Sequence, residues 1–552
     1  MTPYNDRGVK LSRGRQLLSY LTIPEYFART VERFPDRAAV GNTKDHPGEP
    51  DKISFKELDR LSARLAVGLA KFGIKKGDRV AIMSRPRIRF AVATLGILRL
   101  GGWMVPLDPT LAKPEAETLL EKSGAKMVFA PRELFDRLPK DGPTLIDLDD
   151  QERTPFSSLL QDGVPPAVEI SEDDIALLAY TSGTTGNSKG VLLSHRNITA
   201  DVAACIAVMP ITEQDVFLTI APWHHILGLT VSLFLPLYTG AFTLYTDEYR
   251  AISKFLAKYG VTVFIGVPKL YHAMYEKLMN QVRTGLLGRA MLALAPKLVG
   301  NKVKESLTGG KLRFFVSGSA PLDPNVSRGF RRLGIPIIEG YGLTETSPVV
   351  SFCDPFSPKG GSVGRPLPKI EAKLIDKRPD GVGELLVRGP TVMQGYYKND
   401  AATREVIDPD GWFHTGDLAL IDPDGEIFLK GRAKNVIVLE SGKNVYPEEI
   451  EWELSRIPYV EEVLVRGEEE QGHEVVKAII YPNRARLEAD GHLEDAHEVI
   501  WQEIKRRQLR LAPHKRIRRK SDVILVDTPF PKTSTMDIKR HLYRGGNGIP
   551  DA

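Results

Sequence analysis

The segment Tyr180–Gly190, with the sequence YTSGTTGNSKG, combines residue types that bind phosphate. Its glycines let the backbone approach an anion closely, its hydroxyl groups donate hydrogen bonds, and its lysine adds a positive charge. The candidate phosphate-binding residues are Thr181, Ser182, Gly183, Thr184, Thr185, Gly186 and Lys189. Gly190 follows the lysine where the P-loop of NTPases has Ser or Thr. The alternative is a polar turn, although few turns carry this density of donors.

Three further segments combine glycine with charged and hydroxyl residues. They read EGYGLTETSP at 339–348, GWFHTGDLA at 411–419 and LKGRAKNVIVLESGKNVYPEEI at 429–450. An ionised carboxylate such as Asp417 can accept hydrogen bonds from two hydroxyl groups. The alternative interpretation of Asp417 is a turn aspartate before Leu418.

Two adjacent histidines, His224 and His225, lie within PWHHILG at 222–228. We expect their side chains to point apart, which makes a poor metal site, and neither HExxH nor CxxC accompanies them. A histidine satisfied in the core is the alternative for His225.

Alternating helix and strand patterns must position these segments. The predicted helices cover 55–73, 90–101 and 116–124, and the predicted strands cover 79–84, 103–108 and 126–130. Helices that alternate with buried strands indicate βαβ units around largely parallel sheets. The same alternation returns at 212–275 and 311–341.

The pattern changes after residue 380. Short β-runs (GELLVRG, GEIFLKG and NVIVLE) are separated by Gly- and Asp-rich turns and predict an antiparallel subdomain. Beyond residue 433 the order helix, strand, strand, helix, strand indicates a compact α+β unit. We therefore expect an α/β protein with a large N-terminal domain (1–431), which holds parallel sheets and the antiparallel subdomain, and a small C-terminal domain (432–552).

Taken together, the four segments resemble the motifs of the adenylate-forming (AMP-binding) superfamily, in the same order and over residues 25–540. The nearest group is the fatty acyl-CoA synthetases, which PWHHILG, VPKLY, SGSAPL and SGKNVYPEEIE resemble. The resemblance implies an AMP-forming ligase that activates a medium- or long-chain fatty acid. A carboxylate attacks the α-phosphate of MgATP, and the thiol of coenzyme A then attacks the acyl-adenylate and releases AMP. The C-terminal domain rotates between these two half-reactions.

The resemblance also implies roles for individual residues. In the first half-reaction, Lys189 and the glycine-rich loop hold the β- and γ-phosphates, Thr344 donates to the α-phosphate, and Glu345 binds Mg²⁺ with Thr181. The residues implied around the adenine and ribose are Gly318, Ser319, Ala320, Tyr341, Gly342, Asp417 and Arg432. His225 lies between the acyl pocket and the adenylate.

The resemblance implies roles in the second half-reaction for Lys434 and for the loop Ser441–Gly442–Lys443. Lys434 is placed at the hinge of the C-terminal domain, and Ser441, Gly442 and Lys443 are brought to the pantetheine tunnel. Gly442 permits close backbone approach there.

The C-terminal motif departs from the family's pattern. The family carries a lysine in a phrase like PKTxxGKIxR, and this chain reads PKTSTMDIKR at 531–540, with Asp537 at the lysine position. A carboxylate there repels the triphosphate, unless Lys532 or Lys539 takes over the role. Two alternatives therefore stay open: an acyl-adenylate ligase that feeds a carrier protein, and an adenylation-impaired protein that binds acyl-CoA or nucleotide.

Composition limits the remaining classes. The chain has 552 residues, 42% of them hydrophobic and 26% charged, and a net charge of +5, which indicates a soluble multidomain protein and no nucleic-acid partner. Two cysteines exclude a disulfide framework. Without a secretory signal or a membrane-spanning stretch, we expect a cytoplasmic protein, with peripheral contact at the inner membrane face as an added hypothesis.

Three remaining features leave alternatives open. Residues 281–304 hold five basic residues and no acid, and their leucines form either a membrane-touching helix face or part of the core. Residues 505–520 hold nine basic residues that face either the phosphates of coenzyme A or solvent. GGSVG at 360–364 matches the nucleophile elbow of serine hydrolases, but the following RPLPK argues against the helix which that motif needs.

Overall fold

The computed structural model describes most of the chain. The described residues are 21–46, 48–151, 154–181, 188–283, 291–292, 294–318, 322–354, 359–470, 472–532 and 538–543. Two compact units are present. Unit 1 comprises 1–181, 190–371 and 388–407, and unit 2 comprises 182–189, 372–387 and 408–552. The domain boundary near residue 431 stays a prediction.

The larger sheet of unit 1 has nine strands in the described residues, in the order β15-β14-β13-β12-β11-β9-β10-β1-β2. Its strands are β1 (Ala38–Gly41), β2 (Lys52–Ser54), β9 (Val216–Thr219), β10 (Phe242–Tyr245), β11 (Val263–Gly266), β12 (Phe314–Ser317), β13 (Ile337–Gly342), β14 (Val349–Phe352) and β15 (Arg365–Pro366). The strands from β13 to β1 pair in parallel, so their carboxyl ends lie along one edge of the sheet.

The second sheet of unit 1 has seven strands among the described residues, in the order β18-β8-β7-β4-β3-β5-β6. They are β3 (Arg79–Met83), β4 (Trp103–Leu107), β5 (Met127–Ala130), β6 (Thr144–Asp147), β7 (Ile175–Tyr180), β8 (Gly190–Ser194) and β18 (Gly395–Tyr396). Strands β7, β4, β3, β5 and β6 pair in parallel, whereas β8 runs antiparallel to both β7 and β18.

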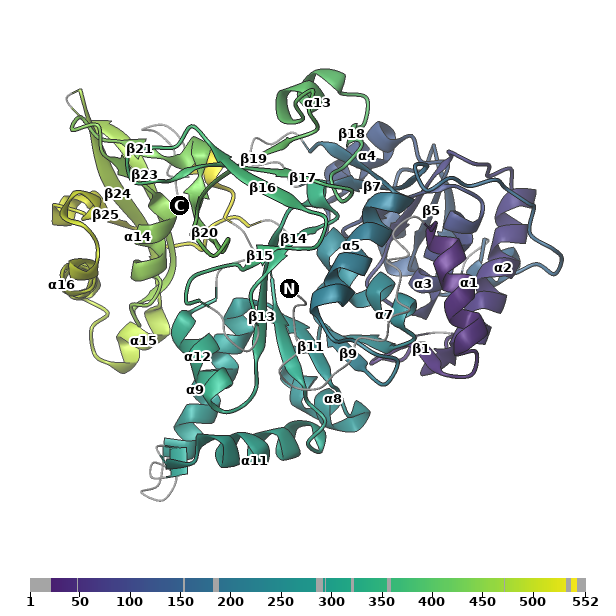
Figure 1. The fold of residues 1–552 in the computed structure, drawn as a ribbon, viewed down its shortest axis with the longest axis horizontal. Helices are drawn as coiled ribbons and strands as arrows, with labels where there is room; N and C mark the ends of the chain where they lie inside the picture. The colour runs from purple at the N-terminus through teal and green to yellow at the C-terminus, as the bar shows by residue number, and fades with distance from the viewer. Residues whose placement is uncertain are drawn as a thin grey trace. The chain divides into compact units, whose positions relative to one another are not determined.

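Helices cover these sheets. They are α1 (Ile23–Arg33), α2 (Phe55–Lys71), α3 (Ile88–Arg99), α4 (Lys113–Ser123), α5 (His195–Val208), α6 (Ile226–Leu229), α7 (Leu235–Thr239), α8 (Ile252–Tyr259), α9 (Pro268–Arg283), α11 (Pro296–Thr308), α12 (Pro324–Arg332) and α13 (Asp400–Val406). Helices α9 and α12 lie side by side (Figure 1). The rings of Tyr275 and Phe330 pack between them, with centroids 5.3 Å apart. The start of helix α2 is fixed by its N-cap residue, because the Ser54 side chain accepts a hydrogen bond from the Glu57 amide.

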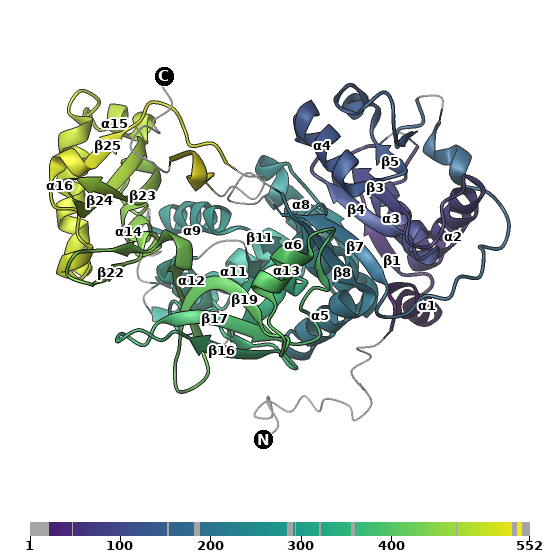
Figure 2. The ribbon, with the colours of Figure 1, turned by 90° about the horizontal axis from the view of Figure 1, so that it is seen from above.

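Unit 2 contains a four-stranded antiparallel sheet and an α+β region. The sheet is β16 (Glu371–Ile375), β17 (Gly383–Arg388), β19 (Phe413–Ile421) and β20 (Ile427–Arg432). The α+β region holds β21 (Ile437–Val438), β22 (Asn444–Val445), α14 (Pro447–Leu454), β23 (Val460–Glu470), β24 (His473–Pro482), α15 (Arg484–Ala489), α16 (Ala496–Arg507) and β25 (Val523–Leu525). Helices α14, α15 and α16 share one core with strands β23–β25 (Figure 2).

These elements confirm the predicted α/β fold, with parallel sheets, an antiparallel sheet and a C-terminal α+β region. The nucleophile-elbow match at 360–364 is wrong as a serine-hydrolase motif, because the short strand β15 follows it instead of a helix. The basic stretch at 281–304 divides: Val299 is buried and Met291 packs near it, but Leu294 and Leu298 are 86% and 57% exposed. Leu287 lies outside the described residues.

Candidate active site

The glycine-rich loop joins two strands that pair with each other. Tyr180 at the end of β7 lies opposite Gly190 at the start of β8, so the loop leaves and re-enters the sheet at the same end of this strand pair. Thr181 and Lys189 are half-buried at the two ends of the loop. The predicted residues Ser182, Gly183, Thr184, Thr185 and Gly186 lie outside the described residues.

The carboxyl end of β12 carries a close backbone approach. A side chain at Gly318 would place its Cβ 2.8 Å from the Leu227 side chain of α6, so only glycine fits without movement. The preceding Ser317 hydroxyl is buried and has no hydrogen-bond partner among the described residues. A buried polar atom without a partner is unfavourable, and a ligand that reaches it would relieve that cost. Ser319 and Ala320 lie outside the described residues.

Strand β13 brings the predicted adenine-stacking residue next to β14. Tyr341 is only 9% exposed and lies opposite Ser351. At Gly342 a Cβ would lie 1.8 Å from the Pro348 carbonyl oxygen, which excludes every other residue type. The chain therefore turns sharply directly before Thr344 and Glu345.

Thr344 and Glu345 lie on a single 3₁₀ turn, Thr344–Thr346, and both are half-buried. The Leu343 amide donates to the Thr346 hydroxyl (3.0 Å), which closes the turn. The Tyr396 hydroxyl donates to Oε1 of Glu345 at 2.9 Å. A metal ion bound together with phosphates needs only one or two protein carboxylates, so the Glu345 carboxylate fits a Mg²⁺ ligand.

The two histidines lie at the start of α6 and do not point apart. Their ring centroids are 4.3 Å apart, and the two ring planes are inclined at 52°. His224 Nε2 lies 3.6 Å from the Asp108 carboxylate, and both side chains are about nine-tenths buried. Burial, aided by His225, lowers the pKa of His224 to about 3, while Asp108 opposes the shift. Burial also lowers the pKa of His225.

In unit 2, Asp417 lies inside β19 and not in a turn, so the turn-aspartate interpretation is wrong. It faces Arg432 of β20 across the antiparallel register, and Arg432 Nε lies 2.9 Å from Oδ1 of Asp417. The Asp417 side chain is 10% exposed, whereas the Arg432 side chain is 41% exposed. The pair presents a nearly buried carboxylate whose charge is balanced on one side, which fits an acceptor for hydroxyl groups.

The predicted hinge and pantetheine residues lie on exposed turns of unit 2. Lys434 is exposed in the short 3₁₀ helix Ala433–Asn435. Ser441, Gly442 and Lys443 form the turn of the β21–β22 hairpin, where Gly442 has φ +72°. Lys443 lies near His514, and its charge adds to burial in lowering the pKa of that histidine.

The C-terminal motif is described on both sides of Asp537, which itself lies outside the described residues. Lys532 forms an ion pair with Glu462, and its side chain is 20% exposed. Lys532 and Ile538 form an isolated bridge, and the Lys539 amide donates to the Pro531 carbonyl at 2.9 Å. The Lys539 side chain is half-buried and has no ion-pair partner among the described residues.

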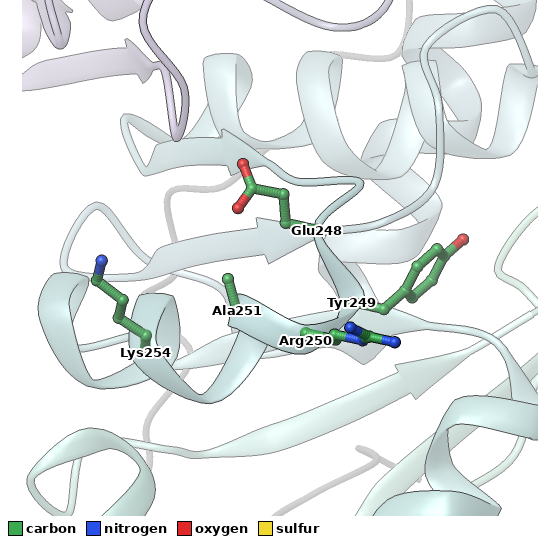
Figure 3. Close-up of a pocket in the computed structure, with 5 residues that line it drawn as sticks. All are labelled: Glu248, Tyr249, Arg250, Ala251 and Lys254. Carbon is green, nitrogen blue, oxygen red and sulfur yellow. The ribbon is translucent and has the colours of Figure 1, made fainter.

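A surface hollow of about 620 Å³ lies elsewhere in unit 1, between β10 and α8. It is lined by Glu248, Tyr249, Arg250, Ala251 and Lys254. Their polar side chains point in different directions and do not converge on one point (Figure 3). None of the predicted site residues lines it, so we assign the chemistry to the residues described above.

Three residues near the predicted site are absent from the sequence-based predictions. Asp108 approaches His224, Tyr396 binds Glu345, and Asp201 accepts a hydrogen bond from the Val349 amide at 3.0 Å. Burial raises the pKa of Asp201 well above its usual range. Asp108 had a usable signal, because it directly follows the parallel strand β4. Asp201 and Tyr396 had no such signal, since Asp201 lies inside helix α5, Tyr396 lies in the two-residue strand β18, and the partner of each is far away in the sequence.

Comparison with known proteins identifies the class to which this fold and site belong. Residues 27–397 match the AMP-binding enzyme family, and residues 434–544 match the AMP-binding enzyme C-terminal domain. The chain belongs to the AMP-binding enzyme family, and it is an ATP-dependent acid–thiol ligase.

Two similar proteins are named as long-chain-fatty-acid ligases, and a third is known from its ATP-bound structure. The long-chain-fatty-acid–CoA ligase of Escherichia coli O157:H7 is 33% identical over 501 residues, which cover 81% of this chain and 83% of that protein. A long-chain-fatty-acid–[acyl-carrier-protein] ligase of Arabidopsis thaliana, AEE15, is 27% identical over 637 residues and covers 94% and 85% of the two chains. ATP-bound MatB from Rhodopseudomonas palustris aligns with a TM-score of 0.75 and 26% identity, over 95% of this chain and 98% of its own.

Proposed function

We propose that this protein is an AMP-forming fatty acyl-CoA synthetase that activates a medium- or long-chain fatty acid and transfers it to coenzyme A. The observation that carries the proposal is the Thr344–Glu345 turn, which follows β13. In this turn the Glu345 carboxylate accepts a hydrogen bond from the Tyr396 hydroxyl. Adenylation brings a carboxylate and a triphosphate together, so it requires charge neutralisation at this kind of position.

The phosphate and base contacts in this proposal come from residues at the ends of β7, β8, β12 and β13. Lys189 neutralises the β- and γ-phosphates, and Thr344 donates a hydrogen bond to the α-phosphate. Tyr341 stacks on the adenine, and the backbone at Gly318 lies against its other face. Glu345, with Thr181, holds Mg²⁺, which draws negative charge from the phosphate oxygens when it is bound.

Unit 2 supplies the ribose contact. Asp417 accepts hydrogen bonds from both ribose hydroxyls, and its nearly buried position keeps water from competing for the carboxylate. Arg432 balances the charge of Asp417 and orients it through Nε. Its Nη1 also donates to the Thr415 carbonyl at 3.1 Å, which fixes the plane of the guanidinium group.

Lys434 is the proposed hinge of a C-terminal domain that starts at residue 432 and rotates between the half-reactions. Its exposed position in a short 3₁₀ helix between β20 and β21 supports this role. The exposed turn at Ser441–Lys443 then reaches the pantetheine arm of coenzyme A.

The basic segment 505–520 is the proposed contact for the phosphates of coenzyme A. Part of its charge is used inside the domain, since Lys515 pairs with Glu449 and Lys520 pairs with Glu498. Arg510 and Arg518 are exposed. Their guanidinium groups are accessible to a phosphate, which arginine binds through two donors in one plane.

Lys539 is the proposed substitute for the lysine that Asp537 replaces. Lys532 is engaged by Glu462, and releasing it would leave that carboxylate, which is 9% exposed, without its cation. Lys539 carries no such constraint among the described residues, and its backbone is anchored to Pro531 at the base of the loop.

A ligase that delivers its acyl group to a carrier protein is the second candidate. The similarity to AEE15, which is named for an acyl carrier protein, favours it. The two candidates share the adenylation step and differ only in the thiol that accepts the acyl group.

Peripheral membrane contact is proposed for the face that includes Leu294, Lys297, Leu298 and Lys302. These four residues are exposed; Leu298 lies in α11, and Leu294 precedes that helix on the other side of the non-helical Ala295. An apolar pair flanked by lysines suits an anionic lipid surface. In the described part of the chain, no helix has the length and apolarity needed to cross a membrane.

Pyrophosphate release with a panel of carboxylates tests the proposal directly. Straight-chain acids of eight to sixteen carbons should be activated and aromatic acids should not, with octanoate and benzoate as the first pair. Free coenzyme A should then discharge the adenylate. Discharge only by a carrier protein with a free phosphopantetheine thiol would select the second candidate, and activation of aromatic acids alone would contradict the fatty-acid assignment.

A further inference from the structure

Segment 390–397 connects two parts of the candidate active site in unit 1. At one side it extends the sheet next to β8, the strand that leaves the glycine-rich loop. The Tyr397 amide donates to the Gly190 carbonyl at 2.7 Å, and the Gln394 amide donates to the Leu192 carbonyl at 2.9 Å. Backbone hydrogen bonds thus fix this segment relative to the exit of the loop.

The same segment forms three hydrogen bonds with residues 345–347, in and directly after the Glu345 turn. The Met393 amide donates to the Glu345 carbonyl (2.9 Å), the Ser347 hydroxyl donates to the Thr391 carbonyl (2.8 Å), and the Tyr396 hydroxyl donates to the Glu345 carboxylate (2.9 Å). The first contact holds the backbone of the turn, and the second holds the side chain of Ser347 directly after it. The contact from Tyr396 differs, because it holds the reactive group itself.

We propose that Tyr396 is a positioning residue that fixes the Glu345 carboxylate for Mg²⁺ binding, an inference that rests on the proposed function of Glu345. Tyr396 is 7% exposed, so its ring cannot swing away from the turn. Its hydroxyl group binds Oε1 and leaves Oε2 of Glu345 to the metal. A glutamate side chain that is already held loses less conformational entropy when it binds a metal ion.

The neighbouring tyrosine provides a matched control. Tyr397 is half-buried and its ring packs edge-on against Trp103, with centroids 5.9 Å apart. Its hydroxyl has no hydrogen bond to Glu345. Tyr396→Phe and Tyr397→Phe therefore remove the same atom from adjacent residues, and both keep the ring that packs.

The test measures metal binding without turnover. Mn²⁺ replaces Mg²⁺ and is titrated by electron paramagnetic resonance into the full-length protein with a non-hydrolysable ATP analogue. A hydrogen bond to a charged group at a partly exposed site supports an effect of about tenfold. We expect Tyr396→Phe to raise the Mn²⁺ dissociation constant about tenfold, and Tyr397→Phe to leave it within twofold.

Measurements in a Glu345→Gln variant separate the positioning role of Tyr396 from the metal-binding role of Glu345. If Tyr396 acts through Glu345, Tyr396→Phe should have no additional effect on Mn²⁺ binding in that background. An equal effect in both backgrounds, or a dissociation constant within twofold in Tyr396→Phe alone, overturns the role of Tyr396 while the metal role of Glu345 stands. Unchanged Mn²⁺ binding in Glu345→Gln itself overturns the metal assignment in the proposed function, and the role of Tyr396 with it.

Discussion

Replacing Asp417 with asparagine isolates the ribose contact from the fold. The amide keeps the shape of the side chain and one acceptor oxygen for Arg432, whose side chain is 41% exposed, so the loss in stability should stay below about 1 kcal/mol. Hydrogen bonds to a charged acceptor contribute about 1 kcal/mol more than neutral ones. Two ribose hydroxyls therefore lose about 2 kcal/mol together, which predicts an ATP affinity about 30-fold weaker.

The preference for ATP over 2′-deoxyATP gives a sharper readout than affinity alone. Removing one hydroxyl should weaken binding about 30-fold in the unmodified protein, where a charged bond of about 2 kcal/mol is lost, and about fivefold in Asp417→Asn. Equilibrium titration of both nucleotides measures this difference. The control is Asp408→Asn, because Asp408 accepts turn hydrogen bonds from the Asp410 and Trp412 amides and should leave both affinities unchanged. An unaltered preference in Asp417→Asn would refute the ribose assignment.

Lys189→Ala should slow pyrophosphate release about tenfold or more at subsaturating ATP, and an unchanged rate would remove this lysine from the phosphate site. Burial raises the pKa of Glu339 from 4.5 to about 7. The folded protein thus binds that proton more tightly, the free energy of unfolding should fall by up to about 3 kcal/mol as pH rises from 4.5 to 7, and Glu339→Gln should flatten this dependence in urea titrations. Lys539→Ala should reduce the rate of adenylation about tenfold, Lys532→Ala should leave it unchanged, and Asp537→Lys should raise it about tenfold. Transfer to coenzyme A from supplied acyl-adenylate is the control and should be unaffected. Equal effects of the two alanine substitutions would contradict the role of Lys539.

Helices and strands with strong periodicity could be predicted from the sequence. The helix predicted at 55–73 is α2 (Phe55–Lys71), and the strand predicted at 79–84 is β3 (Arg79–Met83). Their apolar residues repeat with the period of the element, and the fold buries them as a face or a run. Strand β18 has only two residues, and its pairing with β8 depends on a partner about 200 positions away. Local sequence carries no trace of such a contact.

The candidate site divides in the same way. Glu345 and Asp417 could be proposed because their motifs combine glycine with reactive residues at fixed spacing. The sequence could not tell whether Asp417 lies in a turn or a strand, and the long strand β19 decides this question. The interpretation of the histidine pair is wrong on the direction of the side chains, because the two ring centroids lie 4.3 Å apart directly before the short helix α6.

Tyr396 shows what residue type alone leaves out. The sequence around it, MQGYYKND, contains two adjacent tyrosines that no local rule distinguishes. The hydroxyl of Tyr396, in β18, contacts Glu345, whereas Tyr397, which directly follows the strand, packs its ring against Trp103. The orientation of the Glu345 carboxylate thus depends on a segment that pairs with β8, the strand that follows the glycine-rich loop.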